Sequence, residues 1–281
     1  MSQDLCMEFD IQKAIQKIEN LPTFSQAGRR ALAMLSEPNV NQDDLAIIIK
    51  SDQALTAKIL AAVNSPVFSL QREISNLGEA LRFLGLSETR KMVFVATTHF
   101  LFGGTQDYKT WQHAILSATI AEKLSETCIE QINKNDAYLA GLLHDVGKTF
   151  IEKIVPVVYR QVLPSLTQEM GRLNAELSLF GMDHTEIGGM MLDSWNFNEQ
   201  FVNAVSYHHS PVFAFANPLG HLVWVTNQTA HLDDHEASDD GKITTRTIEF
   251  LGLHSINQLE DIKNKAQVEV DIFLKKMEAL L

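Results

Sequence analysis

The stretch at positions 141–148 reads Gly141-Leu142-Leu143-His144-Asp145-Val146-Gly147-Lys148. An imidazole and a carboxylate follow directly after two leucines, in a window of helical character. Burying such a pair is costly unless something compensates the charge, and a bound divalent cation compensates it well. On a helix, His144 and Asp145 both reach one ion, while Lys148 lies on the face of His144 and meets an anion such as phosphate. The alternative is a surface His-Asp pair without a metal.

The composition is that of a globular protein, with 281 residues of which 45% are apolar and 21% charged. The formal net charge of −12 argues against a general basic surface, so we expect no nucleic-acid partner. Cys6 and Cys128 fit neither a disulfide framework nor zinc ribbon spacing, which indicates a reducing compartment. The first residues do not resemble a signal peptide, and no apolar run approaches the roughly 18 residues of a membrane span. We therefore expect a soluble cytoplasmic protein with no membrane partner.

Hydrophobic spacing predicts helices along the whole chain, and no strand alternation persists for more than a few residues. Side chains that cap helices mark several N-termini. The helices with the clearest bounds or caps are predicted over 108–128, 136–148 and 258–281, and after Asn41, Asp52, Asp183 and Asn198. The predicted fold class is all-α.

The run Gly103-Gly104-Thr105 is the clearest internal break. It divides the chain into an N-terminal helical half, 1–103, and a second helical half, 104–232. An acidic run at 233–240 is typical of a solvated loop, and together with the C-terminal helix it forms a third segment, 233–281.

Five of the ten histidines lie at helix edges or inside apolar helices, and they follow one another at intervals along the second half. Helical bundles build metal sites from inward side chains on facing helices. Six ligands from four helices suit a site for one or two divalent transition metal ions, with iron, manganese, nickel and zinc all acceptable. The candidate ligands are His113, His144, Asp145, His184, His208 and His209.

Each histidine also has a structural interpretation. His113 fits a hydrogen-bonded core residue, and His184 fits a helix cap or a partner of Glu186. His208-His209 fits a pair that complements the dipole at a helix C-terminus. The other histidines show no such grouping and are interpreted as structural or surface residues: His99, His221, His231, His235 and His254.

The order of these ligands, with Gly147-Lys148 after the His-Asp pair, resembles the HD superfamily of metal-dependent phosphohydrolases. It is most similar to the extended ligand set of the cyclic-di-nucleotide phosphodiesterase branch. The first half is similar to the HDOD domain, the HD-related output domain. The motifs that carry this second similarity are Leu21-Pro22-Thr23-Phe24, Ile49-Lys50-Ser51-Asp52-Gln53-Ala54-Leu55-Thr56, Ile59-Leu60-Ala61-Ala62-Val63-Asn64-Ser65 and Ala80-Leu81-Arg82-Phe83-Leu84-Gly85.

The resemblance covers roughly residues 15–232 and implies a bacterial, all-α protein. Its fold would be a multi-helix HD-like bundle with the N-terminal helical subdomain packed on the half that carries the histidines. The chain departs from the hydrolases at Asn227, which stands where they carry a metal-binding aspartate, and the Gly-Tyr-Pro signature is missing after His184. Asparagine offers a neutral oxygen and is a weaker ligand for a divalent ion.

Two functions follow from the resemblance. The first is a signalling or regulatory output module with a metal site, which acts through partner signalling proteins or senses a ligand. The second is a metal-dependent phosphohydrolase acting on a phosphomonoester, a nucleotide or a cyclic dinucleotide, with Asp145 and Lys148 as catalytic residues. There, water attacks phosphorus and Lys148 steadies the phosphate oxygens. The retained ligands favour the hydrolase, whereas Asn227 favours the regulatory module.

Overall fold

The computed structural model describes residues 27, 28, 30, 31, 34, 40–102, 108–214, 217–232 and 242–277. These residues form helices and no strand, which confirms the all-α prediction. The predicted break at Gly103-Gly104-Thr105 and the acidic run at 233–240 lie outside the described residues. Among the described helices, none has both the length and the apolar character needed to cross a membrane.

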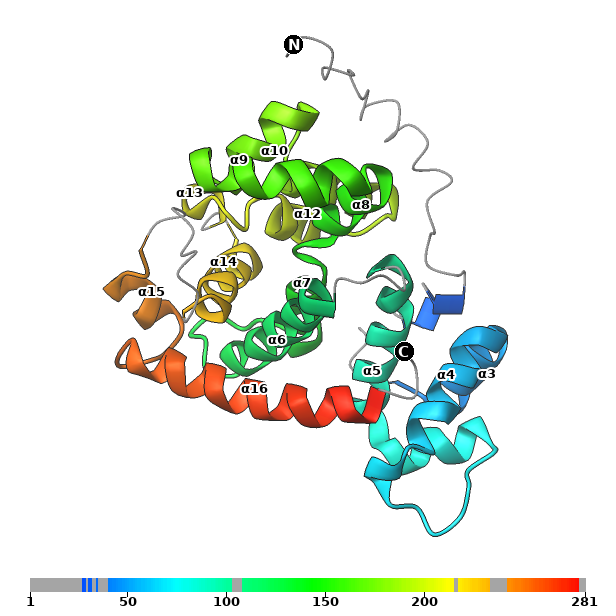
Figure 1. Cartoon of the computed structure of the whole chain (residues 1–281). Coiled ribbons are helices and arrows are strands. Elements are labelled where there is room, and N and C mark those ends of the chain that lie inside the picture. The colour runs from blue at the N-terminus through cyan, green and yellow to red at the C-terminus, as the bar shows by residue number, and fades with distance from the viewer. Residues whose placement is uncertain are drawn as a thin grey trace.

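The first lobe contains α3 (Gln42–Lys50), α4 (Gln53–Val63), the short η2 (Pro66–Phe68) and the first part of α5 (Leu77–Phe102), at the lower right of Figure 1. The side chains of Asn41 and Asp52 accept hydrogen bonds from backbone amides in the first turns of α3 and α4, as their positions predict. Gly85 interrupts α5 with φ 71° and ψ 172°, a positive φ that glycine adopts at little cost.

The second lobe is built on two central helices, α6 (Tyr108–Ser125) and α7 (Lys134–Leu143). They approach closely because Gly141 has no side chain: a Cβ there would lie 2.9 Å from the Cα of Ala118. The buried helix α14 (Pro218–Ala230) packs against both of them.

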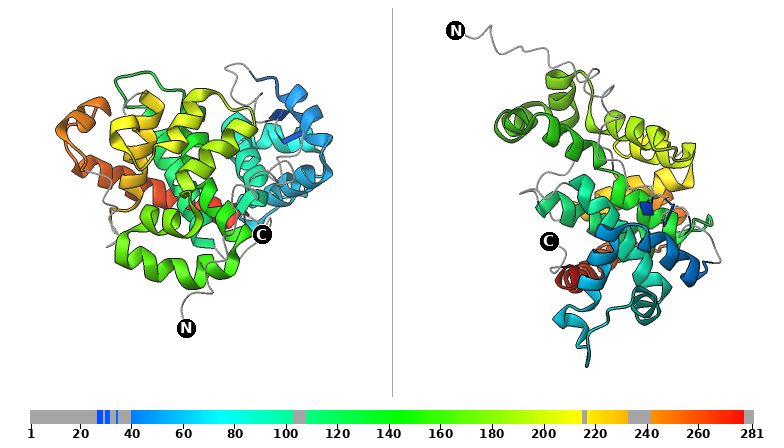
Figure 2. Two further views of the ribbon diagram at one scale, coloured as in Figure 1. Left: turned by 90° about the horizontal axis from the view of Figure 1, so that it is seen from above. Right: turned by 90° about the vertical axis from the view of Figure 1, so that its right-hand side faces the viewer.

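The other helices of this lobe surround that pair (Figures 1 and 2). They are α8 (Val146–Ile154), the π-helical turn η3 (Val158–Val162), α9 (Leu163–Met170), α10 (Arg172–Phe180), α11 (His184–Ser194), α12 (Glu199–Ser206), α13 (Pro211–Ala214) and α15 (Thr245–Phe250). The N-caps predicted at Asp183 and Asn198 both form.

The last described helix, α16 (Asn257–Met277), runs below α6 and α14 toward the first lobe in Figure 1. It contacts α6 and α14 of the second lobe and α4 and η2 of the first. An ion pair between Lys276 Nζ and Glu88 Oε2, 3.1 Å apart, adds a link to α5. This helix therefore joins the two lobes.

The prediction of one continuous helix over 136–148 is wrong. Helix α7 ends at Leu143 and α8 begins at Val146, and between them Asp145 has φ −99° and ψ 13°. The ring of His144 donates from Nδ1 to the carbonyl of Gly141, 2.7 Å away, and so satisfies a carbonyl in the last turn of α7. The His-Asp pair consequently lies at the corner between two helices.

The corner is held against α11 by a contact that only glycine allows. A Cβ on Gly147 would lie 1.9 Å from the carbonyl oxygen of His184 and 3.0 Å from the amide nitrogen of Gly188. The N-termini of α8 and α11 thus meet backbone to backbone, and this contact brings Asp145 and His184 together.

We expect Gly147→Ala to lower the free energy of unfolding by about 3 kcal/mol or more, because a methyl group would force the two backbones apart. The matched control is Gly78→Ala, where the nearest atom to a Cβ is a side-chain oxygen at 3.2 Å. Denaturant unfolding of both variants measures the difference. Equal stability of the two variants would contradict the close contact.

Candidate metal centre

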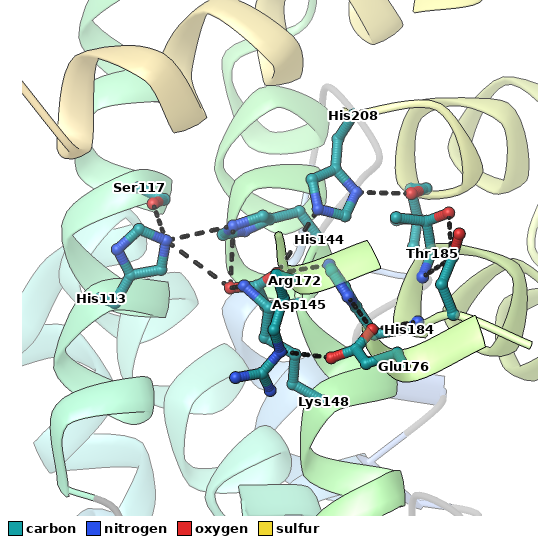
Figure 3. A network of polar contacts seen from close by, with 12 residues as sticks. His113, Ser117, His144, Asp145, Lys148, Arg172, Glu176, His184, Thr185 and His208 are labelled. Carbon is teal, nitrogen blue, oxygen red and sulfur yellow. Dashed lines mark hydrogen bonds and ion pairs between the residues drawn. The ribbon is translucent and has the colours of Figure 1, made fainter. Parts of the chain in front are cut away.

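The structure brings all six predicted ligands into one cluster, shown in part in Figure 3. The ligand atoms form two groups, each with its atoms within 4.8 Å of one another. The first group holds Asp145, His184, His208 and His209, and the second holds His113, His144 and Asp145. We call these six residues the ligand cluster.

Asp145 belongs to both groups because its two carboxylate oxygens face different imidazoles. Oδ1 lies 3.5 Å from Nε2 of His184 and 3.4 Å from Nε2 of His208. Oδ2 lies 3.3 Å from Nε2 of His144 and 3.7 Å from Nε2 of His113. The carboxylate is therefore placed as a bridge between two candidate ion positions.

His144 and His208 are oriented by the same kind of hydrogen bond. His144 follows the end of α7, and His208 lies just beyond the end of α12. Each places Nδ1 next to the carbonyl three residues earlier: Gly141 O at 2.7 Å for His144, and Val205 O at 2.6 Å for His208. Because a carbonyl only accepts, Nδ1 is the donor in both rings, and Nε2 is the nitrogen that faces the cluster.

The ring of His184 is oriented in the same way, but the acceptor for its Nδ1 is a carboxylate rather than a carbonyl. Its Nδ1 lies 2.6 Å from Oε2 of Glu176, and its backbone amide donates to the same oxygen at 2.9 Å. Arg172 donates from Nε to the other oxygen of Glu176. Burial opposes the charge of Glu176, yet the contacts with His184 and Arg172 lower its pKa to about 2. A carboxylate behind a histidine is the usual outer support of a metal ligand.

Sequence reasoning missed Glu176 and Arg172, and the suggested pairing of His184 with Glu186 is wrong. Glu186 instead accepts from the backbone amide of Asp183 and completes a capping box at the start of α11. The available signal was a glutamate with apolar neighbours, in the sequence Ala175-Glu176-Leu177, eight residues before His184. A charged residue on the inward face of a helix needs a partner.

The cluster leaves buried polar atoms without a hydrogen-bond partner among the described residues. They are Nε2 of His184, Nε2 of His208 and Oδ1 of Asp145. Nε2 of His113 and Nε2 of His144 are 3.2 Å apart. Two nitrogens bound to one tetrahedral ion at about 2.0–2.1 Å lie about 3.3 Å apart, so this spacing fits shared coordination.

The protonation state of three of the histidines also allows them to bind a metal ion. Burial lowers the pKa of His113 well below its usual value, lowers that of His184, and lowers that of His208 to about 3. These rings are therefore neutral near pH 7, which is the form that binds metal ions. The donor set, neutral imidazoles with one carboxylate, fits a divalent transition metal.

Lys148 is not on the face of His144, because the helix breaks between them. Its Nζ lies 2.8 Å from Oδ2 of Asp145. Burial opposes the charge of Asp145, but His144 and Lys148 hold the pKa of that carboxyl well below its usual range. The side chain of Lys148 keeps 16% of its surface exposed, so its ammonium can also meet a ligand from solvent.

Asn227 lies in α14 and is buried, and neither atom of its side-chain amide has a hydrogen-bond partner in the described part of the chain. His231, one helical turn later, stacks its ring on that of His113 at 4.5 Å with an interplanar angle of 29°. The interpretation of His231 as an ungrouped residue therefore missed a contact with the cluster. Residues four apart share a helix face, so Asn227 lies on the face of α14 that meets His113.

The family model of the HDOD domain matches residues 21–211, which is more than half of the chain. The chain therefore belongs to the HDOD domain family. A curated relative, an uncharacterized protein of Treponema pallidum (strain Nichols), is 24% identical over 252 residues. That alignment covers 86% of this chain and 48% of the relative, so the chain spans about half the relative's length.

Solved structures share the fold. An HDOD domain protein of unknown function from Geobacter sulfurreducens is 25% identical, with a TM-score of 0.61 and coverage of 96% of this chain and 98% of that one. A Shewanella amazonensis SB2B protein, provisionally described as a phosphohydrolase, is 20% identical with a TM-score of 0.69, covering 95% and 97%. A Marinobacter aquaeolei VT8 protein, provisionally described as a signal transduction protein, is 19% identical with a TM-score of 0.75, covering 96% and 64%.

We expect Arg172→Met to destabilise the protein by about 2–3 kcal/mol, because the buried carboxylate of Glu176 would lose its cationic partner. The control is Arg72→Met, which breaks a pair with Glu79 in which the arginine side chain is 74% exposed. We expect the control to cost less than about 0.5 kcal/mol. Thermal and denaturant unfolding measure both values, and similar losses would show that Glu176 does not depend on Arg172.

Proposed function

We propose that this protein is a regulatory module of the HDOD kind whose ligand cluster binds one or two divalent transition metal ions. One observation carries the metal proposal. Nε2 of His184 and Nε2 of His208 face Oδ1 of Asp145 across 3.4–3.5 Å, and within the described part of the chain neither nitrogen has a hydrogen-bond partner. Leaving three buried polar atoms unpaired is costly, and a cation between them removes that cost.

The two groups define two candidate positions that share Asp145. One ion would be held by His184, His208, His209 and Asp145 Oδ1, and the other by His113, His144 and Asp145 Oδ2. The first position has four candidate ligands, of which His184 and His208 are fully buried, whereas the second has three, of which His113 is 18% exposed. We infer that the first position binds its ion more tightly.

The regulatory part of the proposal rests on family membership and on the neutral Asn227 in place of an acidic ligand. A relative of the same fold is provisionally described as a signal transduction protein. We infer a cytoplasmic protein that acts on signalling partners, in keeping with its two cysteines and the acidic net charge of −12.

The first test is elemental analysis by plasma mass spectrometry of the purified protein, compared with His144→Ala. We expect one or two equivalents of a transition metal in the wild type and a loss of at least one equivalent in the variant. His254→Ala, a change at an exposed histidine, should keep the wild-type content. A wild-type protein that contains no metal and takes up no added manganese, iron, nickel or zinc contradicts the proposal.

The second candidate is a metal-dependent phosphohydrolase, and the placement of Lys148 favours it. A bound divalent ion would supply Lewis acidity, which polarises a phosphoryl oxygen and acidifies water. In that reaction Lys148 would hold a phosphate oxygen at the exposed edge of the cluster. Glu176 would keep the proton on Nδ1 of His184, so that the ring remains a neutral ligand through the reaction.

Two assays distinguish the candidate functions: phosphate release from phosphomonoesters and nucleotides, and ring opening of cyclic dinucleotides to the linear dinucleotide. The regulatory proposal expects metal-loaded wild type to hydrolyse no more substrate than His144→Ala, because Asn227 leaves the centre short of an acidic ligand. Turnover by the wild type that falls at least tenfold in Lys148→Met, with unchanged metal content, would favour the hydrolase instead.

A further inference from the structure

His113 is oriented differently from the histidines that use an outer hydrogen bond. Three histidines of the ligand cluster each have Nδ1 within 2.6–2.7 Å of an acceptor outside the cluster. The polar contacts of His113 with the described residues all start from Nε2 (Figure 3): His144 at 3.2 Å, Ser117 at 3.5 Å and Asp145 at 3.7 Å. Within that part of the chain, no hydrogen bond from Nδ1 sets the rotation of this ring.

A ring from another helix covers His113 instead. His231 directly follows the last residue of α14, and its half-buried ring stacks on that of His113, with centroids 4.5 Å apart and an interplanar angle of 29°. Helix α14 packs against α6, which carries His113. A side chain changes its orientation by moving from one staggered rotamer to another. A ring packed on the face of His113 hinders the movement that would take its Nε2 away from Asp145.

We propose that His231 is a positioning residue of the metal centre, which holds His113 in the orientation that the second ion position requires. His231 belongs to neither group of candidate ligand atoms, so it acts on an ion through His113. This inference rests on the metal binding proposed above and assigns a role to a residue outside the ligand cluster.

The stack makes the two ion positions depend on different parts of the fold. His113 is a candidate ligand of the second position and not of the first. The second position therefore requires the last turn of α14, where the amide of His231 donates to the carbonyl of Asn227 across 3.3 Å. The free energy of an aromatic ring pair corresponds to about a two- to tenfold change in affinity. Loss of the stack should weaken the second ion by that factor and leave the first ion bound.

The test is a manganese titration of the full chain, with electron paramagnetic resonance to detect coupling between two neighbouring ions. We expect the wild type to bind two ions, and His231→Ala to keep the tighter ion and bind the other about two- to tenfold more weakly. His231→Phe should retain the wild-type affinities and the coupled signal, because it keeps a ring and has no nitrogen. His221→Ala is the control: it removes another stacked histidine of α14, whose ring lies 4.0 Å from that of Phe250, and should change neither affinity.

His231→Gln provides a second variant without a ring, should His231→Ala fail to fold, and it should lose second-ion affinity by a similar factor. Wild-type affinity for the second ion in either folded ringless variant overturns the positioning role, and so does weak binding by His231→Phe, which would make His231 a ligand. A wild type that binds fewer than two manganese ions overturns the second position and this inference with it. Only a wild type that takes up none of manganese, iron, nickel and zinc overturns the metal proposal as well.

Discussion

The carboxylate of Asp145 is the feature on which the second lobe depends. It is buried at a helix corner, and its two oxygens face imidazoles that come from three other segments of the chain. A carboxylate in such a place is stable only with nearby positive charge or strong donors. Lys148 supplies one such partner at 2.8 Å. Because Gly141 and Gly147 have no side chains, the helices that carry the imidazoles pack close enough to reach Asp145.

Helix ends, rather than helix middles, orient most of the site. His144 and His208 each satisfy a carbonyl near the end of a helix and in doing so fix which ring nitrogen carries the proton. His184 is the first residue of its helix and uses Glu176 for the same purpose. In His144 and His208, a single hydrogen bond thus satisfies a carbonyl at the helix end and also determines which ring nitrogen is the donor. His113, within α6, is held by the ring of His231.

Local signals predicted the helices well. Caps at Asn41, Asp52, Asp183 and Asn198 act within one turn, so the sequence reveals them. The order of the histidines also identified the residues of the cluster. The break at His144-Asp145 escaped prediction because the apolar periodicity continues across it. Glu176 and His231 were missed because the imidazoles that they contact, those of His184 and His113, lie on other helices, and only the packed structure shows these contacts.

Helix α16 supplies side chains to two separate parts of the core. Leu259 and Ala266 belong to the cluster of apolar residues around Trp224, whereas Val270, Phe273 and Leu274 belong to the larger cluster that includes α3 and α4. Neither lobe can lose its structure without uncovering part of this helix. The free energies of unfolding of the two lobes are therefore coupled, and we expect the described helices of both lobes to unfold together.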